Sequence, residues 1–275
     1  MKRAPAVAIA FAVLLSGVAG GQEATPRDPK SPIPGHADGR GPTGPVELKI
    51  ISPRPEEIVP IPPPAPGQPA AKGAPATLKF ELKNYETFLD PATRTGQGIA
   101  IVLDAHPPQV LYDSTKGWTY RSLPKGTHTV RAFPVRPWQE SIKEPGAFAT
   151  VTFHVGEKDG KNTPLPGAPL LTPNQPKGKY PKSEAGRILL DFYVTGCRVV
   201  EGNSPDACRV RYRVDQLPEV KLTKWVPAWL ENLSAGRHAY VLGLTRGERV
   251  IENGPFNLVQ ETFEIEEGGA PASPR

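Results

Sequence analysis

The chain has 275 residues, with 33 Lys and Arg against 28 Asp and Glu, which gives a formal net charge of +5. This length allows one large or two ordinary domains, and so mild a basic excess, spread along the chain, argues against a nucleic-acid-binding protein. The 35 Pro and 27 Gly make up over a fifth of the chain, and helix-period runs are almost absent. The composition therefore predicts short strands joined by many turns.

The N-terminus has the layout of a secretory signal peptide. Met-Lys-Arg precedes a mostly apolar run at 4–15, and small residues follow at 16–21. The apolar run is shorter than the roughly 20 residues of a transmembrane helix. We therefore expect a signal peptide at 1–20, with an N-terminal anchor as the alternative. The mature protein is expected to be exported, periplasmic or secreted, with no membrane span after cleavage.

Four segments lack strand-like alternation. Residues 21–45 are rich in Pro and Gly and predict a disordered spacer, 157–167 predict a linker, and 267–275 predict a disordered tail. The fourth segment, a Pro-rich loop at 53–76, cannot be a central strand. We interpret it as a stiff connection, and the alternative is a ligand for an aromatic groove on a partner.

The two regions between these segments repeat each other. The motif Leu-x-x-Gly-x-His occurs at 123–128 and again at 233–238, each time before alternating apolar residues. Further matches follow at offsets of 108 to 111 residues, such as Phe153 with Phe263. Nearly constant offsets in several separate segments indicate a duplicated domain. We expect the first domain at 46–156 and the second at 168–266.

Two motifs of the first copy resemble bacterial extracytoplasmic immunoglobulin-like domains. They are Leu-Pro-Lys-Gly-Thr-His-Thr-Val at 123–130 and Thr-Val-Thr-Phe-His-Val at 150–155. In that family, a leucine, a turn and Gly-x-His lead from strand E into strand F, and Thr-Phe-x-Val ends the domain. The resemblance implies an all-β fold of two tandem immunoglobulin-like antiparallel β-sandwiches behind the Pro-rich N-terminal spacer. It says little about activity, since family members are mostly binding, adhesive or spacer modules.

The repeated histidines are candidates for a ligand or a base, but a structural interpretation is favoured. Each ring lies just past a turn, on the inward side of its strand, where it can bond a loop carbonyl across the corner. A motif present in both copies follows the fold rather than a reaction. We therefore expect structural roles for His128 and His238 and for the turn glycines Gly126 and Gly236.

The two cysteines, Cys197 and Cys208, are predicted to form a disulfide, because an even pair this close in an exported chain is most simply bonded. A thiol metal site is the alternative, without a Cys-x-x-Cys or nearby His to support it. Asp104 and His106 could contribute to a metal site. Two ligands are too few, however, and the second copy has Asp215 without a matching His. No metal and no cofactor are predicted.

The most site-like stretch is the loop at 134–141. In an immunoglobulin sandwich the B–C and F–G loops share one end, so this loop should lie near the loop at 84–97. An aromatic ring flanked by charges suits recognition of a sugar or a peptide. The equally weighted alternative is that the tryptophan folds back to cap the core. The candidate binding residues are Arg136, Trp138, Gln139, Glu140 and Tyr85.

The outward face of one strand differs between the copies. In the second copy it carries three arginines, which either pair with acids such as Glu219 or, less favoured, grip an anionic polymer: Arg209, Arg211 and Arg213. In the first copy the same face is small and apolar: Gly98, Ala100 and Val102. We expect that face to be covered by the proline tract or by the other domain.

No familiar catalytic signature occurs in the sequence, whether Gly-x-Ser-x-Gly, His-Glu-x-x-His or a phosphate-binding Gly-rich loop. We therefore predict a non-enzymatic exported binding or structural module of the cell envelope. Its expected partners are an envelope protein or polysaccharide, and not nucleic acid. The alternatives are a carbohydrate-binding or metal-binding accessory domain and, third, a hydrolase.

Overall fold

The structure is a computed structural model. It describes residues 25–26, 33, 36–64, 66–67, 69, 71–202 and 204–267. The predicted signal peptide and all but the first residue of the predicted tail lie outside these residues. Within them, every element is a β-strand except for one 3₁₀ turn at Lys182–Glu184, which confirms the all-β class. No helix of the described chain is long and apolar enough to cross a membrane.

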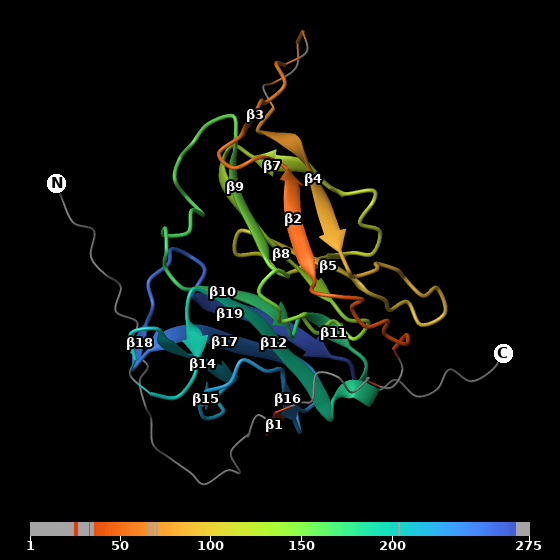
Figure 1. The fold of residues 1–275 in the computed structure, drawn as a ribbon, viewed down its shortest axis with the longest axis vertical. Helices are drawn as coiled ribbons and strands as arrows, with labels where there is room; N and C mark the ends of the chain where they lie inside the picture. Colours follow the sequence, from red (N-terminus) through yellow and green to blue (C-terminus); the bar gives the residue numbers. More distant parts are fainter. Residues whose placement is uncertain are drawn as a thin grey trace.

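The first sandwich forms the upper part of Figure 1 and consists of two facing sheets. One sheet has the order β2-β4-β7, with bounds Glu47–Ser52, Gly73–Lys83 and Trp118–Pro124. The other has the order β3-β9-β8-β5-β6, with bounds Ile58–Val59, Ala149–Val155, Gly126–Val135, Gly98–Leu103 and Gln109–Leu111. Neighbours are antiparallel apart from β3 and β9, which are parallel.

The second sandwich repeats this arrangement in the lower part of Figure 1. Its smaller sheet has the order β16-β12-β10, with bounds Ala228–Glu231, Arg187–Thr195 and Leu170–Gln175. Its larger sheet runs β11-β19-β17-β14, with bounds Gly178–Tyr180, Leu258–Ile265, Gly236–Arg246 and Ala207–Val214. Three short strands extend this sheet: β13 (Arg198–Val199), β15 (Val220–Leu222) and β18 (Arg249–Val250). The strand β11 is parallel to β19, as β3 is to β9, so the two sandwiches share one topology.

Each sandwich has its own core, built from the alternate residues that the pleat turns inward. Leu78, Ile101 and Phe153 are buried in the first core, and Leu190 and Tyr212 in the second. Each large side chain removed from water contributes about 1.5–3 kcal/mol. These inward rows are what the two copies have in common.

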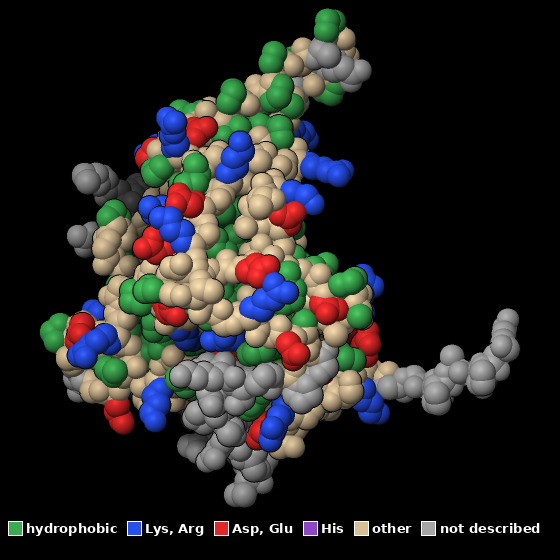
Figure 2. All heavy atoms as spheres, turned by 45° about the vertical axis from the view of Figure 1, so that its right-hand side comes forward, with side chains coloured by type: hydrophobic (Ala, Val, Ile, Leu, Met, Phe, Trp, Pro, Cys, Tyr) green, Lys and Arg blue, Asp and Glu red, His purple; other side chains and the backbone are tan. Residues whose placement is uncertain are grey.

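The Pro-rich loop between β2 and β4 protrudes at the top of Figure 1, away from the second sandwich, and hydrophobic side chains gather at its tip in Figure 2. The segment predicted as loop at 53–76 contains two pieces of strand. Ile58 and Val59 pair in parallel with β9, and β4 begins at Gly73. Pro75 is tolerated in β4 because the register shifts between Ala74 and Ala76, and a bulge needs no ladder bond from proline.

Part of the predicted spacer is ordered. Thr25–Pro26 forms β1, which pairs antiparallel with β16 at the edge of the second sandwich. Residues 36–43 follow the loop at 84–97 of the first sandwich, where Ala37 N donates to Thr95 Oγ1 over 2.7 Å. The partners of this segment lie far away in the sequence, and the segment itself has no periodicity. Its composition therefore indicated disorder.

Candidate functional site

The two sandwiches meet along a buried junction. The outward face of β5 and β8 packs on the outward face of β10 and β12, and Val102 and Phe133 are fully buried there. Tyr193 of β12 inserts into this face, with ring centroids 5.5 Å from Phe133, 4.9 Å from Phe148 and 4.9 Å from Trp225. The expectation that the small apolar face is covered by the other domain is therefore confirmed.

Arg131 of β8 crosses the junction. Its side chain is 1% exposed, and Nη1 donates to Leu171 O over 2.8 Å and to Thr172 Oγ1 over 3.2 Å. Nη2 donates to Asp104 O, and the guanidinium lies 4.7 Å from the centroid of the Phe256 ring. Burial lowers the pKa of Arg131 to about 9. One cation of the first sandwich is thus held largely by groups of the second.

Asp191, in the middle of β12, is the fully buried anion of the junction. Its carboxylate accepts from Ser141 N over 2.9 Å and from Asn174 Nδ2 over 2.7 Å, and it pairs with Lys143 Nζ. Asn174 Nδ2 also donates to Gln139 O over 2.6 Å. The loop after β8 is therefore fastened to the second sandwich by a buried charge, and removing one partner of such a pair costs about 3–5 kcal/mol.

The candidate binding residues lie together, with Trp138, Glu140 and Tyr85 buried and Arg136 and Gln139 partly exposed. Trp138 is 5% exposed, and its Nε1 donates to Glu140 Oε2 over 3.1 Å. Arg136 pairs with Glu140 at 3.5 Å. Tyr85 OH donates to Val135 O over 3.0 Å. The indole therefore has the position that the capping alternative describes.

Two further contacts cover the loop. Gly39, from the predicted spacer, lies against the indole of Trp138, since a Cβ there would meet the ring at 3.4 Å. Gln139 Nε2 donates to Tyr112 OH over 3.2 Å. Ligand binding by this loop stays a prediction, and a ligand would first have to displace residues 36–43 or open the junction.

The residues that fasten the junction were not predicted from the sequence. Arg131 and Asp191 carried a usable signal, because each is a charge between apolar neighbours in its strand. Lys143 and Asn174 carried none, since a polar residue in a loop or at a strand end is ordinary. Only the docking of the second sandwich brings Lys143 to Asp191 and Arg131 to the backbone of Leu171.

The repeated histidines make the same contacts in both copies. His128 Nδ1 lies 2.8 Å from Asp104 Oδ2, and its Nε2 lies 2.9 Å from Pro124 O. His238 bonds Asp215 at 2.7 Å and the carbonyl of Ser234 at 2.9 Å. These bonds span the corner between two strands, as the structural interpretation expects, although the role itself stays a prediction.

Charge at the first corner is set by opposing effects. Burial disfavours a charged imidazole, but the hydrogen bonds to Asp104 and Pro124 O outweigh it and raise the pKa of His128 above its ordinary value.

The turn requires glycine at 126, where φ is 133° and a Cβ would approach Asp159 Oδ2 to 2.8 Å. Gly236 has a similar φ of 123°.

The metal-site alternative finds its residues engaged elsewhere. His106 Nδ1 lies 3.1 Å from Leu103 O, and both oxygens of Asp104 bind groups of the corner. In the part of the chain that the structure describes, no three His, Cys, Asp or Glu side chains are arranged to hold a metal ion. The predicted disulfide is confirmed, with Cys197 and Cys208 bonded and their Cα atoms 6.0 Å apart.

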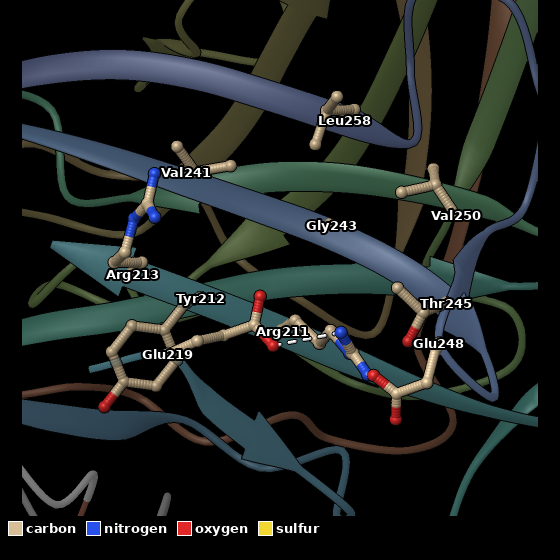
Figure 3. A pocket seen from close by; sticks show the side chains of 10 residues that line it. All are labelled: Arg211, Tyr212, Arg213, Glu219, Val241, Gly243, Thr245, Glu248, Val250 and Leu258. Carbon is tan, nitrogen blue, oxygen red and sulfur yellow. Dashed lines mark hydrogen bonds and ion pairs between the residues drawn. The ribbon is translucent and has the colours of Figure 1, made fainter. Parts of the chain in front are cut away.

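On the arginine face of the second sandwich, Arg211 is paired with acids, as favoured (Figure 3), whereas Arg209 Nη2 donates to Gly202 O over 3.2 Å. Arg211 is largely buried, and its Nη1 lies 3.0 Å from Glu219 Oε1 while Nη2 pairs with Glu248. The hydrogen bond from Arg211 lowers the pKa of Glu248 to about 2, and Lys221 assists. Both terminal nitrogens of Arg211 thus find acids within their own sandwich.

Comparisons with known proteins yielded structures only. No family model matches the sequence, and neither does any curated protein. The chain is similar to fibronectin(III)-like modules of Clostridium thermocellum CbhA, with TM-score 0.26, 10% identity and coverage of 80% of this chain and 94% of that one. It is also similar to the D00–D0 domain of intimin, with TM-score 0.21, 11% identity and coverage of 77% and 98%. Scores this low leave the function to be argued from the molecule itself.

Proposed function

We propose that the protein is a non-enzymatic exported module that binds or supports other components of the cell envelope. The observation that supports this best is the junction, in which charged and aromatic side chains of both sandwiches are buried, above all Arg131 and Asp191. Bending at such a junction would leave buried charges without partners, which is costly. The pair of sandwiches therefore suits a rigid spacer, or a platform that holds partners at a fixed separation.

The Pro-rich loop is the part of this unit that best suits a partner. It lies at the end remote from the junction (Figure 1), and Ile58 at its base is 56% exposed. A proline-rich segment is already extended, so binding orders little additional chain. An envelope protein with an aromatic groove is the corresponding class of partner.

A hydrolase has one arrangement to recommend it, and the geometry speaks against it. Lys143 Nζ donates to Ser141 Oγ over 2.6 Å, which resembles a serine with a basic neighbour. The same Nζ also pairs with the buried Asp191, and Ser141 N donates to that carboxylate over 2.9 Å. Both groups are thus engaged in the contact between the sandwiches, so we assign the three residues to the junction.

Capture from envelope extracts tests the proposal. The mature chain is immobilised, and retained proteins and glycans are both identified, beside a variant in which residues 60–72 are replaced by a short Gly-Ser linker. We expect an envelope protein to be retained by the full chain and lost with the loop. Retention of polysaccharide alone would favour the carbohydrate-binding alternative. Retention of nothing beyond what an unrelated sandwich protein retains would contradict the proposal.

A further inference from the structure

A groove runs along an open edge of the junction. Its larger part has a cavity volume of about 360 Å³ and is lined from both sandwiches, with Arg131, Phe256 and Val259 among the lining residues. A narrow recess of about 20 Å³ adjoins it, since Pro173 and Glu261 line both. The two parts form one site that neither sandwich could make alone.

Lys177 lines the recess and is the unusual group in it. Its Nζ is buried, with no hydrogen-bond partner among the residues that the structure describes. The backbone beneath it is well held, because Lys177 N donates to Tyr180 OH over 3.0 Å and that hydroxyl donates to Gln175 Oε1 over 2.6 Å. A buried ammonium without an acceptor is costly, so an anion that reaches it would supply the partner that the protein does not.

The chemistry of the recess supports an anion there. Burial lowers the pKa of Lys177 to about 8, so in most molecules this side chain is still charged at neutral pH. The titratable groups that line the recess with it are His106, Tyr240 and Glu261. An anion at Nζ therefore meets a cation that burial has left poorly solvated.

The walls of the recess restrict what can enter. Four proline rings line it, and they offer apolar surface without an N–H: Pro107, Pro108, Pro173 and Pro176. A volume of about 20 Å³ accepts roughly one water-sized group. Only the end of a ligand, such as one oxygen of a carboxylate, fits beside Lys177. The rest must extend past Pro173.

The larger part of the groove suits an apolar body. Its apolar lining includes four consecutive or nearly consecutive residues: Pro255, Phe256, Leu258 and Val259. A cavity of a few hundred Å³ with mostly apolar walls and one or two polar anchors is typical of small-molecule sites. Glu261 lines both parts, so every negative charge on a ligand meets repulsion there. The one unpaired ammonium of Lys177 can offset a single carboxylate, which favours a ligand with one negative charge.

We propose that this interdomain groove binds a small apolar monocarboxylate, with its carboxylate on the Lys177 ammonium and its apolar body beside Phe256. The inference goes beyond the envelope role, since a spacer needs no small-molecule site. It depends on the groove alone, so either proposal can fail without the other.

Binding to the full mature chain is measured by NMR titration with hexanoate and 3-phenylpropanoate, each beside its neutral amide. We expect saturable shifts confined to residues that line the groove, and affinity for each acid at least about tenfold above that for its amide, because a hydrogen bond to a charged group is lost. Equal affinity of acid and amide, saturation at a different surface, or no saturable binding of either acid would overturn the proposal.

Two lysine variants assign the anchor. Lys177→Met keeps the length and apolar stem of the side chain and should reduce affinity for the acids at least about tenfold. Lys179→Met removes an exposed lysine two residues away, which pairs with Glu264 at 3.1 Å, and should leave affinity unchanged. Melting temperature and spectral dispersion show that each variant is folded. Undiminished acid binding by a folded Lys177→Met protein would overturn the assignment.

Discussion

The two sandwiches share a topology, yet they use the same outward face in opposite ways. In the first, Val102 lies opposite Arg131 across β5 and β8, and the face is buried under the second sandwich. In the second, Arg213 lies opposite Val241 across β14 and β17, so that arginine and valine have changed places. The inward-facing side chains, which the two copies share, build the sandwich. The outward-facing side chains, which differ, determine whether a face packs against a neighbouring domain.

The partners of the arginines explain the difference. Arg131 donates mainly to groups across the junction, while Arg211 finds Glu219 and Glu248 within its own sandwich. The charge of Arg211 therefore does not depend on a neighbouring sandwich, whereas that of Arg131 does.

The largest expected effect comes from making the first face resemble the second. Val102→Arg places a charge in the centre of the junction without an acid to receive it, and we expect the sandwiches to separate. Small-angle scattering should show a larger radius of gyration, and unfolding should lose its single transition. The matched variant Arg213→Val should change neither. A compact Val102→Arg protein would contradict the account of the junction.

Removing the buried anion should have the next largest effect. Asp191→Ala removes the buried carboxylate that accepts from Lys143, Asn174 and Ser141 N, and we expect a loss of about 3–5 kcal/mol in the free energy of unfolding. Chemical denaturation measures it. The control is Glu81→Ala, an exposed acid on β4 that pairs with Lys83 at 3.4 Å, for which about 0–1 kcal/mol is expected. Similar losses in the two variants would show that Asp191 holds no special place.

The disulfide distinguishes the second sandwich from the first and should contribute less. Replacing Cys197 and Cys208 by serine opens a short loop, and the expected loss is about 3 kcal/mol or somewhat below. Thermal unfolding with and without reductant should show the same difference in the wild type. If neither the double variant nor reduction lowers the melting temperature, the disulfide does not stabilise the second sandwich.

The smallest effect concerns pH at the first corner. The pKa of His128 is raised in the folded state, so its contribution is complete below the unfolded pKa of about 6.5 and is lost as pH rises through the folded value. The difference in unfolding free energy between wild type and His128→Leu should therefore shrink from pH 6 to pH 8. A difference that grows over this range would have the wrong sign.

Much of the fold was predictable from the sequence, because alternation and the repeated Leu-x-x-Gly-x-His motif depend on neighbouring residues. The disulfide was predictable for the same reason, since its cysteines are only 11 residues apart. The junction was predictable only in part. The apolar face around Val102 indicated that another part of the chain covers it. The pairing of Lys143 with Asp191 could not be predicted, because it depends on how two folded sandwiches dock.

The candidate site shows the same limit. The loops at 84–97 and 134–141 were expected to meet, and Tyr85 does contact Val135. The burial of Trp138 could not be predicted, because it depends on Gly39, which lies in a segment without periodicity. Lys177 gave no signal in sequence, where it is an ordinary lysine after a proline.

The rigidity of the junction is the central claim, and one distance distribution tests it most directly. Spin labels at Lys116→Cys in the first sandwich and Arg187→Cys in the second occupy side chains that are 80% and 69% exposed. Pulsed electron resonance on the frozen mature chain should give a single narrow distribution that broadens when Val102→Arg is added. A distribution as broad in the parent as in that variant would contradict the rigid two-sandwich unit.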